Sequence, residues 1–279
     1  MNKTPLPVPT EARHEGYKIE DGITQSMLCT FLQCRYKSHI QLQGWQPDQR
    51  VGAFDFGEVI HRLIENGSLP VLERESPSRL IDDWHKEQVA TGASPEDLDM
   101  CEGLVTPIYL SYMDKWANKD AKHLFKFIEG MFNVVWMGYR LRGKIDGVFS
   151  YVGQDPNDLW ILENKTKGQI SEDVIEDMLV YDFQILFYTV ALQALGYTVK
   201  GCLYNIVRKP QQRFGKKDTK ETFLARVAEA VQADPDHFFR RYEITFTSEM
   251  LDRFKKELVY KLADLSYSLM PIIDTLTDD

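Results

Sequence analysis

The sequence predicts an α+β protein in which helices flank a mixed central sheet, because strand-like and helical segments follow one another in a distinctive order. Between residues 124 and 167, three segments rich in β-branched and aromatic residues are separated by the turn-forming stretches GYR and GQDPND. A long apolar segment with helical spacing follows at 171–196, and another strand-like segment at 199–209. With a helix before the first strand, this order gives an αβββαβ core preceded by an N-terminal helical elaboration.

The first part of the chain is expected to be a flexible lead followed by two helices. Residues 1–23 carry three prolines by position 9. Apolar positions at helical spacing predict a helix over 24–42, with Thr24 as its N-cap. A second helix is predicted over 53–67, with Gly67 as its C-terminal cap.

An acidic helical region comes next, and residues 55–102 hold twelve acidic and four basic residues. Helices are predicted over 78–89 and 94–118, and Pro107 is expected to kink or split the second. We interpret about 68–120 as a helical insertion within a single domain that extends from 24 to 279.

The three strand-like segments, 124–137, 139–152 and 158–167, are expected to pair antiparallel because only short turns connect them. Ser171 is placed to cap the long helix that follows, and acids in its first turn suit the helix dipole. After the strand at 199–209, the chain is predicted to end with a helix near 220–232, a strand at 240–247 and a helix over about 248–270.

The composition argues against several classes of protein. No apolar run approaches the ~20 residues of a membrane helix, and the first residues lack the apolar stretch of a signal peptide, so we expect a cytoplasmic protein without membrane contact. The four cysteines are scattered, which predicts neither disulfides nor a zinc knuckle. The net charge of −9 disfavours a nucleic-acid partner, but residues 208–220 hold six bases and one acid, so polyanion binding stays open.

The stretch DLWILENKTKG places an acid and a base at the end of an apolar strand. Because side chains alternate along a strand, Glu163 and Lys165 share one face while Asn164 points the other way. If the neighbouring strands pair through GQDPND, Asp146 comes beside Glu163, and two such carboxylates require a cation between them at neutral pH. Hard oxygen ligands suit Mg²⁺ or Mn²⁺, and the lysine would complete a pocket for a phosphate ester and an attacking water. A plain ion pair on an exposed strand end is the alternative explanation.

This pattern resembles the signature of the PD-(D/E)XK nuclease superfamily, and specifically its RecB-like exonuclease branch, which includes CRISPR-associated and phage recombination nucleases. FGEVIHRLIE resembles the helical histidine motif of that branch, GKIDGV its Gly-x-x-Asp strand, and DFQILFYTVAL its Gln-x-x-x-Tyr helix. LQCRYKSHIQL resembles its N-terminal Cys-Pro-x-x-Tyr segment, with Arg35 in place of the proline. The resemblance spans about residues 24–207 and implies a restriction-endonuclease-like fold.

The resemblance also implies roles for the individual residues. His61, Asp146 and Glu163 would bind the metal, together with the backbone carbonyl of Asn164, and Lys165 would orient the water and stabilise charge on the phosphorus. Two residues of the Gln-x-x-x-Tyr motif and one additional acid would complete the site: Gln184, Tyr188 and Glu129. A hydrogen-bonded surface histidine, a packed core tyrosine and a solvated strand acid are the structural alternatives for His61, Tyr188 and Glu129.

The chain departs from many relatives in its cysteines. An iron–sulfur cluster needs four ligands, but no cysteine follows Cys202, so no cluster is expected. The phosphate-loop motif G-x-x-x-x-G-K-[ST] is also absent from the sequence, so a helicase or a single-strand annealing protein would be a separate partner.

Together these features predict a Mg²⁺- or Mn²⁺-dependent deoxyribonuclease that acts on DNA ends in repair, recombination or phage replication. A CRISPR adaptation nuclease that trims DNA ends and a catalytically silent DNA-binding subunit on the same fold remain alternatives. The basic strip is the expected DNA contact, on one edge of the cleft: Arg208, Lys209, Arg213, Lys216, Lys217 and Lys220. Its alternative is a solvated loop. The sequence predicts neither polarity, nor strand preference, nor oligomeric state.

Overall fold

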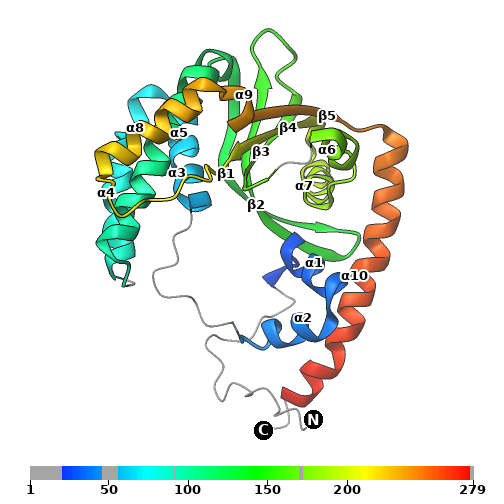
Figure 1. The fold of residues 1–279 in the computed structure, drawn as a ribbon. Coiled ribbons are helices and arrows are strands. Elements are labelled where there is room, and N and C mark those ends of the chain that lie inside the picture. The colour runs from blue at the N-terminus through cyan, green and yellow to red at the C-terminus, as the bar shows by residue number, and fades with distance from the viewer. Residues whose placement is uncertain (1–20, 46–55, 91, 170–171, 277–279) are drawn as a thin grey trace, which may run out of the picture.

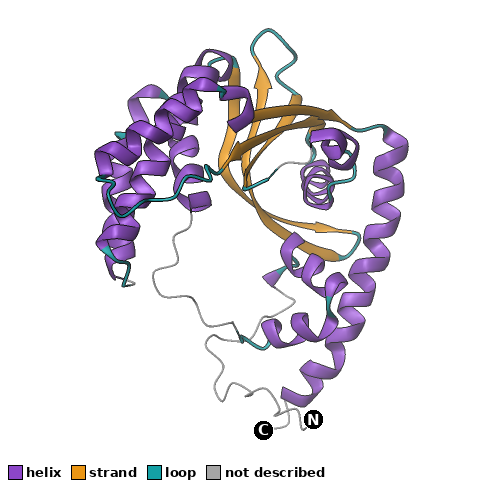
Figure 2. Cartoon of the chain, viewed as in Figure 1, coloured by secondary structure: helices purple, strands orange, loops and turns teal. Residues whose placement is uncertain are grey.

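A mixed five-stranded sheet forms the centre of the molecule, and helices pack on both of its faces (Figures 1 and 2). The computed structural model describes residues 21–45, 56–90, 92–169 and 172–276. The strands lie in sequence order: β1 (His123–Trp136), β2 (Tyr139–Tyr151), β3 (Asp158–Lys167), β4 (Thr198–Arg208) and β5 (Phe239–Thr245). The predicted α+β class is therefore confirmed. Most of the predicted N-terminal lead, residues 1–20, lies outside the described residues.

The helices fall into an N-terminal group before the sheet and a second group that alternates with the later strands. The first group is α1 (Gln25–Gln33), α2 (Arg35–Leu42), α3 (Phe56–Ser68), the 3-10 turn η2 (Val71–Glu73), α4 (Pro77–Ala90) and α5 (Pro95–Asp120). The second is α6 (Glu172–Leu179), α7 (Phe183–Ala194), α8 (Lys220–Ala233), α9 (Pro235–Phe238) and α10 (Ser248–Leu276). None of these described helices is both long and apolar enough to cross a membrane.

Strand β3 lies in the middle of the sheet, and its two neighbours pair with it in different directions. β1 pairs antiparallel with β2, and β2 with β3, as the sequence predicts. β3 then pairs in parallel with β4, and β4 antiparallel with β5. The carboxyl ends of β3 and β4 consequently meet at one edge, with Lys165 opposite Ile206 and Lys167 opposite Arg208.

Two hydrophobic cores cover opposite faces of the sheet. α1, α7 and α10 bury apolar side chains such as Leu28, Phe187 and Leu258 against one face. α3, α4, α5 and α8 form a second core around side chains such as Trp84 and Phe223 (Figure 1). Because α3, α4, α5 and α8 share this core, residues far apart in the sequence are packed together on the second face. Whether about 68–120 is an insertion into one domain remains a prediction.

Two predicted helices are each broken in the structure by a residue that caps the following helix. The helix expected over 24–42 begins at the predicted Thr24 cap but stops at Gln33, because Cys34 is extended (φ −159°, ψ 106°) and its sulfur accepts from Lys37 N. The long helix expected over 171–196 is likewise interrupted after Leu179. There the Asp182 carboxylate accepts from Gln184 N and Ile185 N and starts α7 anew. The predicted cap Ser171 lies outside the described residues.

Gly67 does not end α3 as predicted, because the helix continues through Ser68. A Cβ at Gly67 would lie 3.3 Å from both Met113 Sδ and Tyr109 Oη, so this glycine allows α3 and α5 to approach closely. Pro107 lies inside α5, which continues across it as one helix. The start predicted for the second helix, 53–55, lies outside the described residues.

Candidate active site

Glu163 and Lys165 lie next to each other on the face of β3 that packs against α7. Glu163 is only 1% exposed, and the Lys165 ammonium lies 2.5 Å from Glu163 Oε1. Strand alternation puts both side chains on this face, as expected. A surface ion pair is therefore the wrong description, since the carboxylate is buried.

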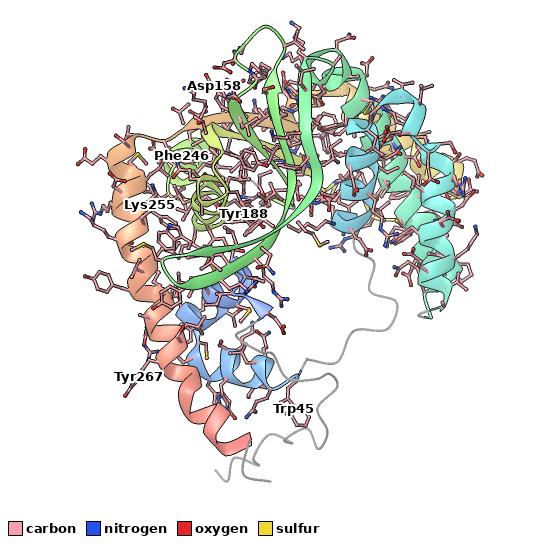
Figure 3. The ribbon with its side chains drawn as sticks, turned by 180° about the vertical axis from the view of Figure 1, so that it is seen from behind. Trp45, Asp158, Tyr188, Phe246, Lys255 and Tyr267 are labelled. Atoms are coloured by element: carbon pink, nitrogen blue, oxygen red, sulfur yellow. The ribbon has the colours of Figure 1, made fainter. Side chains whose placement is uncertain are left out.

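Gln184 holds this pair from α7. Its amide nitrogen donates to Glu163 Oε1 at 2.9 Å, and its amide oxygen accepts from Lys165 Nζ at 2.9 Å. The same nitrogen lies 3.1 Å from Tyr188 Oη, one helical turn later. Tyr188 is 7% exposed and lies between α7 and the β1–β2 strands (Figure 3). The break at Asp182 therefore matters for the site, since it sets where α7 begins and hence where Gln184 points.

Asp146 reaches the same region from β2. The β2–β3 pairing consists of three residue pairs and stops at Gly147 opposite Leu162. Asp146 is the next residue, and its Oδ2 accepts from Asn164 N at 2.7 Å instead of continuing the ladder. The register thus brings Asp146 opposite Glu163, at the point where the two strands separate.

Electrostatics make Glu163 an unusual carboxyl group. Burial is the main cause that raises its pKa to about 7, Lys165 opposes the rise, and Asp146 adds to it. Its second oxygen, Oε2, is buried without a hydrogen-bond partner. A buried carboxylate oxygen without a partner is costly unless a further positive group binds it.

Two further acidic residues adjoin Asp146: Glu129, which the sequence suggested as an additional acid of the site, and Glu65, which it did not. Glu129 lies opposite Asp146 between two β1–β2 pairs, has a positive φ of 51°, and forms an ion pair with Lys144. Glu65 on α3 has a pKa raised by burial, with Lys144 lowering it and Asp146 raising it, so it lies near both. Its position four residues after His61 was the available signal, because residues i and i+4 share a helix face.

Asn164 is held from the opposite face of the sheet by a buried polar network. Asn205 Nδ2 donates to Asn164 Oδ1 at 2.8 Å and to Tyr112 Oη at 2.9 Å. Arg241 Nε donates to Asn205 Oδ1 at 3.0 Å, and its guanidinium binds both carboxylate oxygens of Asp120 at 2.5 and 2.8 Å. This network fixes the strand segment that carries Glu163 and Lys165. Its hydrogen bonds join residues 36 to 121 positions apart, which the sequence pattern does not reveal.

Comparison with known proteins now decides the family. A model of the PD-(D/E)XK nuclease superfamily matches residues 23–272, a range that includes Asp146 and the Glu163–Lys165 segment. The chain belongs to the PD-(D/E)XK nuclease superfamily. It is therefore a nuclease, a phosphodiester hydrolase, and its mixed sheet flanked by helices is consistent with the predicted restriction-endonuclease-like fold.

The nuclease is also similar to a solved structure from Eubacterium rectale described as a "putative exonuclease". The two chains share 13% identity with a TM-score of 0.49, over 90% of this chain and 80% of the other. No curated protein sequence matches the chain.

PD-(D/E)XK nucleases generally use divalent metal ions. The acids of this nuclease provide some of the ligands that such an ion needs. Glu163 Oε2, which has no partner, and the Asp146 carboxylate are hard oxygen donors of the kind that Mg²⁺ and Mn²⁺ prefer. In the described residues, however, no three His, Cys, Asp or Glu side chains are gathered as a ready ligand set. The structure thus brings together Asp146, Glu163, Lys165, Gln184 and Tyr188, but it does not gather His61 with the two acids as ligands.

Some residues of the basic strip contact other parts of the protein, and the others are exposed. Arg208 and Lys209 are half-buried at the carboxyl end of β4, with the Lys209 ammonium 5.7 Å from the Phe56 ring centroid. Lys220 lies 2.6 Å from Glu102. The residues between are exposed: Arg213, Lys216 and Lys217. The strip leaves the sheet at the same edge as Lys165.

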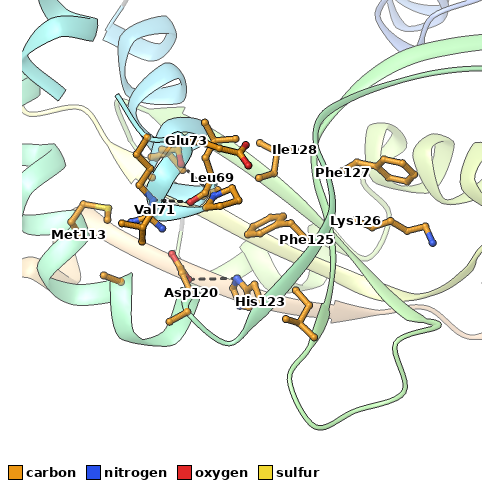
Figure 4. A pocket seen from close by; sticks show the side chains of 18 of the residues that line it. Leu69, Val71, Glu73, Met113, Asp120, His123, Phe125, Lys126, Phe127 and Ile128 are labelled. Atoms are coloured by element: carbon orange, nitrogen blue, oxygen red, sulfur yellow. Dashed lines mark hydrogen bonds and ion pairs between the residues drawn. The ribbon is translucent and has the colours of Figure 1, made fainter. Parts of the chain in front are cut away.

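A hollow of about 770 Å³ lies elsewhere, between the C-terminal ends of α3 and α5 and the start of β1 (Figure 4). None of the predicted site residues lines it. His123 and Asp120 face each other there at 3.7 Å. The candidate active site therefore lies outside this hollow.

Replacing Glu163 with Gln is expected to raise the unfolding temperature of the metal-free nuclease at pH 8. A raised pKa means that the folded state loses stability as pH rises from about 4.5 to 7, because the unfolded chain ionises more easily. The amide avoids this cost, which is on the order of 3 kcal/mol. Scanning fluorimetry should show the difference at pH 8 and its loss at pH 4. Mn²⁺ should stabilise only the wild type, and a variant that unfolds earlier at pH 8 would contradict the prediction.

Proposed function

We propose that this nuclease is a Mg²⁺- or Mn²⁺-dependent deoxyribonuclease of the RecB-like exonuclease branch that hydrolyses DNA from its ends, in repair, recombination or phage DNA metabolism. The observation that carries the proposal is the buried Glu163, which binds Lys165 and Gln184 through one oxygen and leaves the other without a partner beside Asp146. This arrangement offers a cation site with an ammonium group directly beside it.

Asp146 and Glu163 would hold the cation, with the carbonyl of Asn164 and a movement of His61 completing the ligands. When bound, the cation supplies Lewis-acid activation of the phosphodiester and of a water. Lys165, held by Gln184 Oε1, orients the attacking water and counters the charge that develops on the phosphoryl oxygens. Tyr188 supports Gln184, and Glu129 is a further acid beside Asp146.

DNA would be held in part by the basic strip, through Arg208, Lys209, Arg213, Lys216 and Lys217. It begins at the sheet edge that carries Lys165, which supports a phosphate path leading away from the scissile bond. A helicase or a single-strand annealing protein would act as a separate partner.

One experiment tests this function directly. End-labelled linear DNA and closed circular DNA are incubated with the protein and Mg²⁺, Mn²⁺ or EDTA, and the products are sized. We expect mononucleotides or short oligonucleotides from the linear DNA with either cation, and intact circles. Cleavage of the circles would identify an endonuclease, and cleavage in EDTA would contradict metal dependence.

The purified protein is expected to be colourless and free of iron. Cys34 is exposed and Cys202 is buried, and no cysteine follows Cys202 to complete a cluster. Visible absorption spectroscopy and elemental analysis check this expectation. Stoichiometric iron with charge-transfer absorption would contradict it.

A further inference from the structure

One face of the β1–β2 hairpin carries a row of basic residues that leads to the active site. Arg140, Arg142 and Lys144 alternate along β2, so they share one face. The residues between them face α7, and Leu141 and Ile145 are buried in its core. The basic side chains therefore lie on the opposite face.

β1 adds uncharged side chains to the same surface. Met131 pairs with Lys144, Asn133 with Arg142, and Val135 with Arg140. Met131 is 87% exposed and Val135 is 60% exposed. We call these six residues the hairpin face. It contains three bases and no acid, although the whole chain has a net charge of −9.

The hairpin face is held in place by its neighbours. The two-residue turn at Met137 and Gly138 has positive φ at both positions, 49° and 85°, a combination that suits the twist of paired strands. On the other edge of β2, Ile23 N donates to Arg140 O at 2.7 Å, and Arg142 N donates to Ile23 O at 3.0 Å. The arginine stems pass close to Gly22, where a Cβ would lie 3.1 and 3.3 Å from their Cγ atoms. This support orders the arginines before any ligand binds.

The face is continuous with the catalytic acids. Lys144 is ion-paired with Glu129, and Glu129 lies opposite Asp146. Lys144 also lies near Glu65, whose pKa it lowers, whereas Asp146 raises the pKa of the same group. A polyanion on the two arginines would thus extend directly to Asp146.

We propose that the hairpin face binds an unpaired segment of the DNA strand that enters the active site. The proposal rests on the nuclease function proposed above. Phosphates lie against Arg140, Arg142 and Lys144, and the bases contact Met131 and Val135. Bases offer their faces to apolar side chains only when they are unpaired, whereas phosphate contacts alone suit either form of DNA.

The test removes two charges and measures binding without cleavage. Arg140→Gln and Arg142→Gln are combined in a Lys165→Ala background, and the affinity for single-stranded oligonucleotides is measured by fluorescence anisotropy across salt concentrations. The slope of log affinity against log salt concentration should become shallower by about 1.4, because two phosphate contacts are lost. Binding at 0.1 M salt should weaken about 20-fold. The matched control, Arg253→Gln with Lys256→Gln on the exposed side of α10, should change neither. An unchanged slope overturns the proposal, as does a loss confined to blunt duplex DNA.

A second measurement does not depend on arginine substitutions. A photo-crosslinking amino acid at Met131 should form an adduct with single-stranded DNA, whereas the same group at Tyr260, 76% exposed on α10, should not. Equal adducts, or none at Met131, overturn the proposal. Failure of the nuclease function would appear differently, as intact linear DNA with the wild-type protein.

Discussion

Replacing Lys165 with Ala is expected to abolish DNA cleavage while leaving cation binding in place. The ammonium lies 2.5 Å from Glu163 Oε1 and 2.9 Å from Gln184 Oε1, so it is positioned beside the proposed cation site without being a ligand. Removing a group that stabilises developing charge costs on the order of 10²–10³-fold in rate, and more if the water also loses its orientation. Single-turnover cleavage of labelled DNA and calorimetry with Mn²⁺ separate the two effects.

Asp146→Ala and Glu163→Ala should instead abolish both cleavage and cation binding, because each removes an oxygen ligand from a site that has few. Lys200→Ala is the matched control, since Lys200 lies on the neighbouring strand 3.2 Å from Asp158 and away from the site. Absence of Mn²⁺ binding to the wild type, or full activity of Lys165→Ala, would refute this assignment.

Replacing Arg213, Lys216 and Lys217 with Ala is expected to weaken DNA binding for every sequence alike. On duplex DNA, each phosphate contact contributes ~0.9 to the slope of log affinity against log salt concentration. The triple variant should therefore flatten this slope by roughly two to three units. Lys220 is left unchanged because it is paired with Glu102. The cleavage rate at saturating DNA should change little, because the metal site remains whole.

A triple variant on α10 provides the control for this prediction. Replacing Arg253, Lys255 and Lys256 with Ala removes the same charge from a helix on the other side of the sheet (Figure 1). Equal slopes for the two triple variants would show that the strip is a solvated loop and that only total charge matters.

The strands were predicted from sequence within a residue or two, because β-branched and aromatic content changes sharply at residue 124 and short turns leave little choice of pairing. The helix breaks at Cys34 and Asp182 were not predicted. There the apolar periodicity continues across the break, while a single side chain binds the backbone amides of the next helix and restarts it. A local hydrogen bond of this kind outweighs periodicity without altering the pattern of apolar residues.

The candidate site residues on β3 and α7 could be selected from the sequence because they lie in short motifs with fixed spacing. The ion pair of Glu129 with Lys144 and the polar network through Asn205 depend on strand register and on contacts between distant segments. His61 was expected beside the acids, and whether it reaches a bound cation remains a prediction. Sequence spacing indicates which residues share an element face, but not how two faces meet.

The hydrogen bond from Asn164 N to Asp146 Oδ2 gives the site its own spectroscopic probe. The resonance of this amide proton depends on the charge carried by the carboxylate that accepts it. A cation that draws electron density from Asp146 weakens this acceptor, and the ¹H–¹⁵N signal of Asn164 shifts upfield. Because Asn164 is 5% exposed and its side chain is bound by Asn205, solvent exchange and local motion contribute little to that shift. Titration of Mg²⁺ followed at this single resonance would therefore measure occupancy of the proposed metal site without any substrate.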